Sequence, residues 1–322
     1  MVRLWKSALL AGAVTLNACS LAPRYRVPDV PVATQYSSSV HWAAAAPADQ
    51  LDRAGWWNLY REPELGALEK QLIAHNHDLR AAYYHFVQSQ AFVKEASAQY
   101  YPQVSAGGNA QRARESDTRP LRTAAAPADY NTSTLGIAID YEVDLWGRVR
   151  DSVAANRELS QAAQADVAST QLSLEIELAR TYLDLRGDDQ QIQLLEDTID
   201  AYQKALELTR KRHDGGVSSE LDVTRAMTQL SFAQSDLVQL RAKRELLQHA
   251  IAVLVGASAS DFNVAPSIAP IPLPTIPVGV PSALLQRRPD IAAAERRIAA
   301  ANSEIGVARS AYFPTITLGA QG

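Results

Sequence analysis

The sequence has one cysteine, Cys19, in 322 residues, so it can form neither an intramolecular disulfide nor a cysteine-based metal site. Aromatic residues make up only 7% of the chain. Such a composition favours long helices that touch through small side chains over one thick globular core. The formal net charge of -4 gives too weak a field to indicate nucleic-acid binding. We therefore expect a mainly helical protein whose function does not involve nucleic acid.

Patterns typical of catalysis and metal binding are also missing. The six histidines are scattered, and His75 and His77 are two residues apart, not at the i, i+4 spacing of a helical metal site. No glycine-rich phosphate loop precedes a helical pattern. We interpret the adjacent acids Asp188 and Asp189 as a solvated helix face. The sequence thus predicts no enzyme activity, no cofactor and no bound metal.

The N-terminus has the pattern of an export signal. Arg3 and Lys6 precede a short apolar run that is too short to span a membrane, which predicts a signal peptide over residues 1–18. Residues 16–19 resemble a bacterial lipobox, so Cys19 is predicted to be acylated, for example with palmitate, as the first mature residue. The alternative is an ordinary signal peptide with an incidental cysteine. Residues 19–63 would form a lipid-anchored segment.

Two hydrophobic periods follow one another along the chain. Spacing of three and four residues predicts a coiled-coil helix over 64–100. A period of two between 131 and 146 predicts a strand that, with a weaker strand at 101–111, forms a membrane β-hairpin over 101–146. Its apolar side would face lipid, and its polar side would line a lumen with Asp140, Glu142 and Asp144. The alternative is an amphipathic strand on a soluble sheet.

Residues 147–256 predict a long helical hairpin, on the order of 100 Å if straight. Its tip lies at 213–222, where Gly215 and Gly216 suit a helix C-cap and Ser218 or Ser219 suits an N-cap. A proline-rich connector is predicted over 257–283. A rod of this length cannot bury its own apolar seam, so it needs neighbouring helices.

The helix-to-strand stretch 78–110 recurs at 290–322. Aligning Asp78 with Asp290 also aligns Tyr100 with Tyr312, Pro102 with Pro314 and Gly107 with Gly319, without gaps. This pattern indicates an internal duplication. Residues 284–322 are therefore predicted to be the start of a second repeat, a helix and the beginning of a third strand.

Several stretches together carry a family resemblance. YEVDLWG at 141–147, GGVSSELD at 215–222 and RRPDIAAAE at 287–295 are similar to segments of the TolC-type outer-membrane efflux family. The similarity is to its lipoprotein (NodT-like) branch, which serves resistance-nodulation-division multidrug pumps. The fold class predicted is mainly α with a small β part. It combines a long coiled-coil hairpin, a segment of a periplasmic α-barrel, with β-strands of a trimeric outer-membrane barrel.

The resemblance implies the outer-membrane duct of a tripartite efflux pump that exports drugs or other small toxic compounds. Its partners would be two further copies, outer-membrane lipid, a periplasmic adaptor (membrane fusion) protein and an inner-membrane pump. Gly216, Val217 and Ser218 match the adaptor-docking tip, and Asp222 matches an aspartate of the periplasmic gate. For Asp222 the alternative is a first-turn acid favoured by the helix dipole.

Family members continue through a fourth strand and a second helical hairpin. We therefore expect this chain to be an N-terminal fragment that does not work alone. The alternative function is a periplasmic lipoprotein coiled-coil scaffold or adaptor without a pore. The alternating strand at 134–145 favours the duct, because a scaffold has no use for it.

Overall fold

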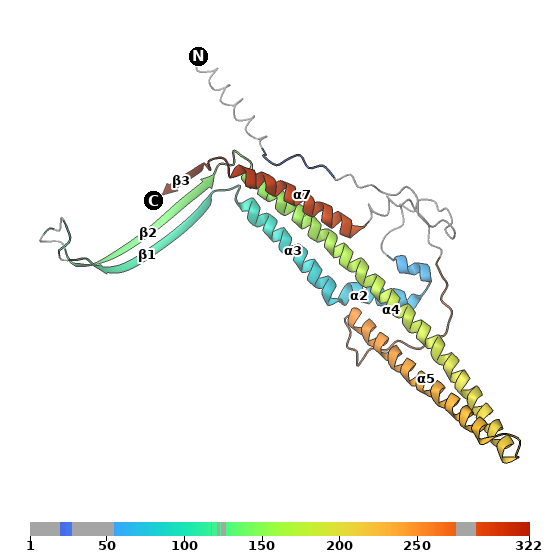
Figure 1. The fold of residues 1–322 in the computed structure, drawn as a ribbon. Coiled ribbons are helices and arrows are strands. Elements are labelled where there is room, and N and C mark those ends of the chain that lie inside the picture. Colours follow the sequence, from blue (N-terminus) through green and yellow to red (C-terminus); the bar gives the residue numbers. More distant parts are fainter. Residues whose placement is uncertain (1–19, 28–54, 117, 121–122, 124–126, 275–287) are drawn as a thin grey trace. The chain divides into compact units, whose positions relative to one another are not determined.

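The computed structural model describes residues 20–27, 55–116, 118–120, 123, 127–274 and 288–322. The predicted signal peptide and Cys19 lie outside these residues. The chain is mostly helical with one small sheet, which confirms the predicted fold class (Figure 1). It divides into two compact units, one formed by residues 1–30, 85–164 and 292–322 and the other by residues 31–84 and 165–291. Within the described residues, none of the helices is both long and apolar enough to cross a membrane.

The first unit contains a three-stranded antiparallel sheet in the order β1-β2-β3. The strands are β1 (Gln103–Arg114), β2 (Asp129–Glu142) and β3 (Thr317–Gln321). β1 and β2 form a hairpin whose register pairs Gly107 with Gly136, and β3 pairs with the other edge of β2. The strand that opens the second repeat therefore joins the hairpin of the first.

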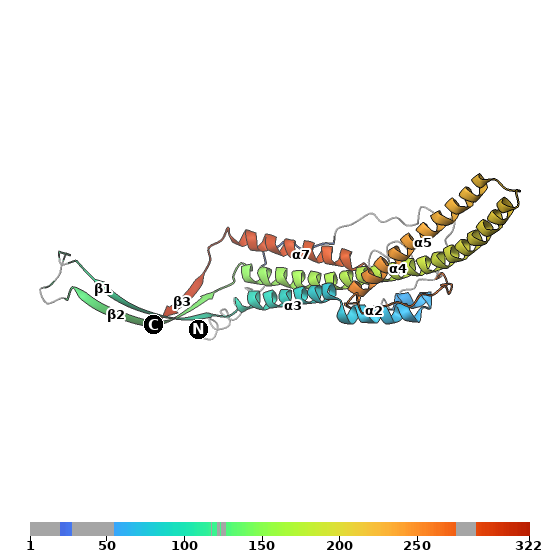
Figure 2. The same ribbon diagram turned by 90° about the horizontal axis from the view of Figure 1, so that it is seen from below.

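Three helices contribute to this unit: the later part of α3 (His77–Ala98), the first turns of α4 (Arg148–Asp214) and α7 (Pro289–Ser310). α4 lies between the other two in both ribbon views (Figures 1 and 2). The Ser89 hydroxyl donates to the Ser160 hydroxyl at 3.1 Å, and Arg296 pairs with Glu158 at 3.3 Å. The two helices of the repeat thus flank one shared helix.

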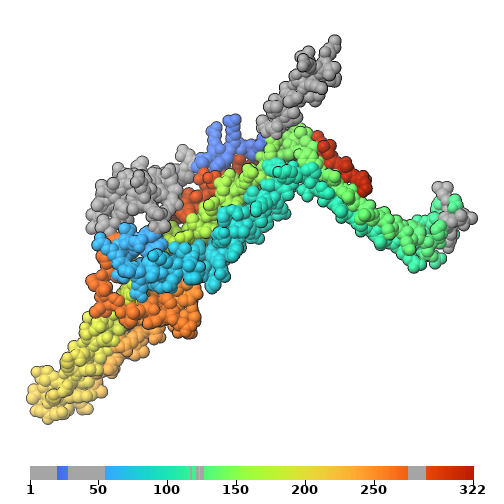
Figure 3. All heavy atoms as spheres, turned by 180° about the vertical axis from the view of Figure 1, so that it is seen from behind, coloured from blue at the N-terminus to red at the C-terminus, as the bar shows by residue number. Residues whose placement is uncertain are grey.

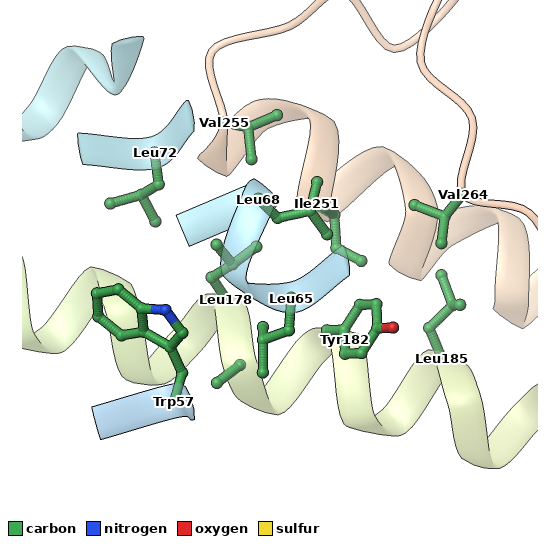
Figure 4. Close-up of a cluster of buried hydrophobic side chains, with 11 residues drawn as sticks. Trp57, Leu65, Leu68, Leu72, Leu178, Tyr182, Leu185, Ile251, Val255 and Val264 are labelled. Carbon is green, nitrogen blue, oxygen red and sulfur yellow. The ribbon is translucent and has the colours of Figure 1, made fainter. Parts of the chain in front are cut away.

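The second unit is built on the rest of α4, with the short 3-10 helix η2 (Trp56–Tyr60), α2 (Pro63–His75) and α5 (Glu220–Leu254). Leucines spaced at three and four residues on α2 face the leucines of α4, as a buried helical stripe requires. Figure 4 shows this core. Its buried members are Trp57, Leu65, Leu68, Leu72, Leu178, Ala179, Tyr182, Leu185, Ile251, Val255 and Val264.

The prediction of one helix over 64–100 is wrong, because Asn76 separates α2 from α3. Asn76 has an extended backbone, with φ -62° and ψ 130°. Its side-chain oxygen accepts from the Leu79 amide at 2.8 Å and its side-chain nitrogen donates to the Leu254 carbonyl at 2.8 Å. The buried amide therefore caps α3 and fastens the break to the end of α5.

α4 and α5 form a helical hairpin, drawn in yellow at its closed end in Figure 3. Gly216 has φ +78°, a left-handed conformation that glycine adopts without a steric penalty. Ser219 is the N-cap of α5, and its hydroxyl accepts from the Asp222 amide at 3.2 Å. Of the two predicted N-cap serines, the structure uses the second.

Candidate functional site

The strand register gathers apolar side chains on one face of the sheet. Val104 lies opposite Ile139, which in turn lies opposite Ala320, and Tyr141 lies opposite Leu318. This face is open rather than covered: Leu135 is 88% exposed. The exposed apolar residues of the face are Val104, Leu135, Ile137, Ile139 and Leu318.

The opposite face of the sheet is polar and open as well. Asn109 lies opposite Thr134, and Asp140 lies between Gln103 on β1 and Gly319 on β3. All four polar side chains are exposed. A sheet in water normally buries one face against a core, so two open faces of opposite character indicate a wall between two different solvents.

The prediction that Asp144 lies on the strand is wrong, because β2 ends at Glu142. The Asp144 carboxylate accepts from the backbone amides of Val149 at 3.2 Å and Arg150 at 3.0 Å, in the first turn of α4. It also accepts from Arg150 Nε at 3.2 Å. A carboxylate at a helix N-terminus is favoured by the unpaired amides and the helix dipole. Asp144 thus starts α4 where the strand ends.

Glu142 is the last residue of β2 and makes a two-pronged ion pair. Arg148 donates to it through Nε at 2.7 Å and through Nη2 at 2.6 Å. The hydrogen bonds to Glu142 raise the pKa of Arg148 above its usual value. Of the three acids predicted to line a lumen, only Asp140 lies within the strand away from its end.

The predicted docking residues form an exposed turn. Val217 is 79% exposed, and its backbone amide donates to the Arg212 carbonyl at 2.8 Å. The Ser218 carbonyl lies 3.0 Å from His213 Nδ1. The backbone of Gly216, Val217 and Ser218 is therefore held by α4, while the Val217 side chain points into solvent.

Asp222 belongs to a capping box with Ser219. Its Oδ2 accepts from the Ser219 amide at 3.1 Å and from the Ser219 hydroxyl at 2.8 Å. These hydrogen bonds from Ser219 lower the pKa of Asp222 below its usual value. The contacts match the alternative of an N-terminal helix acid, and the gate remains a prediction.

The interpretation of Asp188 and Asp189 as a solvated face is wrong, because both are buried. Lys243 Nζ donates to Asp188 Oδ1 at 2.6 Å. Asp189 lies between two arginines: Arg186 donates to it at 2.9 Å and Arg244 at 2.5 Å. The sequence offered one signal, the i, i+3 spacing of Arg186 and Asp189, but nothing local identified Arg244 as the second partner.

The same arginines hold the segment that follows α5. Arg186 Nη1 donates to the Ala265 carbonyl at 2.7 Å, and Arg244 Nη2 donates to the Val264 carbonyl at 2.8 Å. The Ser267 amide donates to Asp189 at 3.0 Å. This network, called here the arginine clamp (Arg186, Asp189 and Arg244), fastens residues 264–267 onto α4 and α5.

A buried carboxyl pair is a second feature that the sequence did not predict. Glu69 on α2 is 0% exposed, and neither of its side-chain oxygens has a hydrogen-bond partner among the described residues. Burial, together with the nearby charge of Glu175, raises the pKa of Glu69 to about 8. Glu175 accepts from Gln171 at 2.7 Å and from Trp56 Nε1 at 3.3 Å. Glu69 is therefore a neutral acid at pH 7 inside the second unit.

The aromatic residues of η2 act as a packing anchor. The rings of Trp56 and Trp57 meet edge to face at 6.1 Å, and Trp56 meets Tyr60 in the same way at 6.4 Å. Trp57 points into the core in Figure 4.

Among the described residues, no three His, Cys, Asp or Glu side chains gather as a metal site.

Comparison with known proteins shows similarity to outer membrane efflux proteins. The family described as "Outer membrane efflux protein" matches residues 68–257 and 280–322. The toluene efflux pump outer membrane protein TtgC of Pseudomonas putida is 33% identical over 316 residues, which cover 97% of this chain and 65% of TtgC. The outer membrane protein OprJ of Pseudomonas aeruginosa is 30% identical, over 97% of this chain and 64% of OprJ.

Solved structures agree with these relatives. The outer-membrane channel OprN superimposes with a TM-score of 0.77 at 32% identity, over 94% of this chain and 66% of OprN. CusC, described in connection with transmembrane channel formation, gives a TM-score of 0.78 at 25% identity, over 94% of this chain and 66% of CusC. The chain spans about 65% of the length of the curated relatives it matches.

Proposed function

Because the chain belongs to the outer membrane efflux protein family, we propose that it forms part of an outer-membrane duct through which an efflux pump expels small toxic compounds. The observation that carries this proposal is the sheet with two open faces, one apolar and one polar. Such a sheet suits a barrel wall with lipid on one side and a water-filled lumen on the other. A scaffold without a pore has no need for the exposed apolar face.

In this duct the protein conducts and performs no chemical step. Asp140 would lie at the lumen surface, where a carboxylate favours cations over anions. Unpartnered apolar side chains along the long helices, such as Leu194, Phe232 and Leu246, would be covered by two further copies in a homotrimer. Lipid on Cys19 would anchor the chain in the outer membrane.

The sheet provides the direct test of the duct. Ile137 and Ala138 are neighbours on β2 and point to opposite faces. Ile137→Lys should impair outer-membrane assembly, because a lysine facing the centre of a bilayer costs about 2–4 kcal/mol. Ala138→Lys should assemble, since its side chain would face water. The amount of assembled protein in outer-membrane fractions measures both variants.

Equal assembly of the two lysine variants would contradict the duct. It would indicate that both faces of the sheet meet the same solvent, as in a periplasmic scaffold. Loss of both variants to the same degree would also count against it. Full assembly of Ala138→Lys with changed ion selectivity would further support a lumen on that face.

The hairpin tip is the proposed docking place for a periplasmic adaptor, which would link the duct to an inner-membrane pump. Its exposed Val217 offers an apolar contact on a turn that α4 holds rigidly. Val217→Asp should leave assembly in the outer membrane unchanged, because the side chain is 79% exposed. Cross-linking of the adaptor to the tip should fall at least about tenfold, since a charge is placed in a desolvated contact.

Val217→Ala is the matched control for the tip, because it shortens the same side chain without adding charge. It should retain most of the cross-linking. If Val217→Asp cross-linked to the adaptor as well as the parent does, the adaptor would have to bind elsewhere.

A further inference from the structure

Residues 20–27 have no regular secondary structure, and residues 20–23 lie against α7 and the first turn of α4, all within the first unit. The Ser20 hydroxyl donates to Asp151 Oδ1 at 2.6 Å. Asn302 Nδ2 donates to the Pro23 carbonyl at 2.7 Å, and Arg309 Nη1 donates to the Leu21 carbonyl at 3.2 Å. The segment is thus held by side chains from two helices rather than by its own secondary structure.

Gly306 makes room for this segment at the centre of its path. A Cβ at this position would lie 2.8 Å from the Ala22 amide nitrogen and would overlap the Asp151 carboxylate. Gly306 and Asp151 are both buried. Glycine inside a helix is less stable than alanine, so its presence here needs a reason, and the close approach of the segment provides one.

The internal duplication shows that this groove is not a general property of the repeat. Where α7 has Asn302, Gly306 and Arg309, the aligned positions of α3 are Gln90, Lys94 and Ser97. The three residues of α7 that accommodate the segment therefore differ in every case from their counterparts. α3 and α7 both pack on α4, but of the two only α7 has the glycine that makes room for the segment.

We propose that α7 and the first turn of α4 form a receptor groove for residues 20–25, which fixes the point where the chain leaves the folded body towards Cys19. Because Cys19 is one peptide unit from Ser20, about 3.8 Å between Cα atoms, fixing Ser20 fixes the attachment point of the acyl chains. This inference rests on the proposed lipid anchor. Asp151 is the fourth residue of α4, so the segment that leads to the anchor leaves the folded part of the chain near the junction between β2 and α4.

Asp151 also determines which residue can follow Cys19. Its Oδ1 accepts from Ser20, and its Oδ2 is buried without a partner among the described residues. An aspartate at position 20 would bring a second carboxylate next to this buried acid. The groove therefore selects a small hydrogen-bond donor at position 20 and rejects an acid.

Gly306→Val tests the groove without changing the N-terminal sequence. In outer-membrane vesicles, trypsin should cleave after Arg24 at least about tenfold faster in this variant, because cleavage follows the fraction of time that the segment is undocked. Ala308→Val is the matched control, since Ala308 is exposed on the same helix. It should be cleaved at the parent rate. Labelling with palmitate is measured on every variant.

A second pair of variants separates docking from the reading of residue 20 during export. Ser20→Asp should speed tryptic cleavage, and adding Asp151→Asn should restore protection, because the asparagine amide can donate to the new carboxylate. If residue 20 acted only on sorting, Asp151→Asn could not restore protection against trypsin. These variants also decide the matter if Gly306→Val fails to accumulate.

Unchanged cleavage in Gly306→Val, or in Ser20→Asp, overturns the proposed groove. Protection of the parent together with absence of palmitate label supports the groove and rejects the lipid anchor on which its function rests. The two failures are therefore distinguishable in one experiment.

Discussion

Replacing Asp189 with alanine should lower the free energy of unfolding by about 3–5 kcal/mol. Its side chain is 1% exposed and accepts from Arg186, Arg244 and the Ser267 amide. Removing it leaves two largely buried guanidinium groups without their shared carboxylate. It also releases one hydrogen bond to the segment after α5. Thermal unfolding of the detergent-solubilised protein, followed by circular dichroism, measures the loss.

Glu196→Ala is the matched control for this loss. Glu196 also joins α4 to α5 through an arginine, Arg241, at 2.6 Å, but both side chains are well exposed. An exposed ion pair contributes about 0–1 kcal/mol, so this variant should unfold close to the parent. Equal losses from Asp189→Ala and Glu196→Ala would show that burial adds nothing to the arginine clamp.

Glu69→Gln should remove a pH dependence of stability and make the protein more stable at pH 8 and above. The pKa of Glu69 is about 8 in the folded chain, against an ordinary value of 4.5. As pH rises from about 4.5 to about 8, the Glu69 carboxyl loses its proton in the unfolded chain but keeps it in the folded chain. The free energy of unfolding therefore falls progressively over this pH range. The accumulated loss for the parent is on the order of a few kcal/mol near pH 8. Glutamine keeps the shape and cannot ionise.

The measurement is the difference in unfolding free energy between parent and variant from pH 4.5 to pH 9. Glu177→Gln is the control, because Glu177 is exposed on the same helix as Glu175. It should leave the slope of the parent unchanged. A Glu69→Gln variant whose stability ran parallel to the parent would refute the neutral buried acid.

Features that depend on local periodicity could be predicted from the sequence. The alternation of Leu135, Ile137 and Ile139 identified the strand, and the glycines at 215–216 with Ser219 located the turn between two long helices. These signals work because a strand or a helical turn is specified by residues within a few positions of one another. The duplication was visible in the sequence because both copies keep the aromatic-proline pair at the end of the helix.

Features that join distant parts of the chain could not be predicted in this way. Asn76 looked like an ordinary helix residue, because its partner, the Leu254 carbonyl, is 178 residues away. Asp189 looked solvated because Arg244 lies 55 residues further on. Asp144 continues the alternating pattern of the strand. Its carboxylate instead accepts hydrogen bonds from the unpaired amides at the start of α4, where the helix dipole also favours it. In each case a single side chain forms hydrogen bonds with a different element of the fold.

The stack of Trp146 on Phe313 has a consequence for how the sheet is made. The ring centroids lie 4.6 Å apart, and Trp146 Nε1 donates to the Pro314 carbonyl across 168 residues. The β1–β2 hairpin is a local structure that closes within microseconds, whereas β3 can pair only after the intervening helices have been synthesised and folded back. During that delay the edge of β2 from Ala138 to Glu142 has no partner strand, a state that invites aggregation. We therefore expect the nascent chain to depend on a chaperone that covers this edge until the third strand arrives.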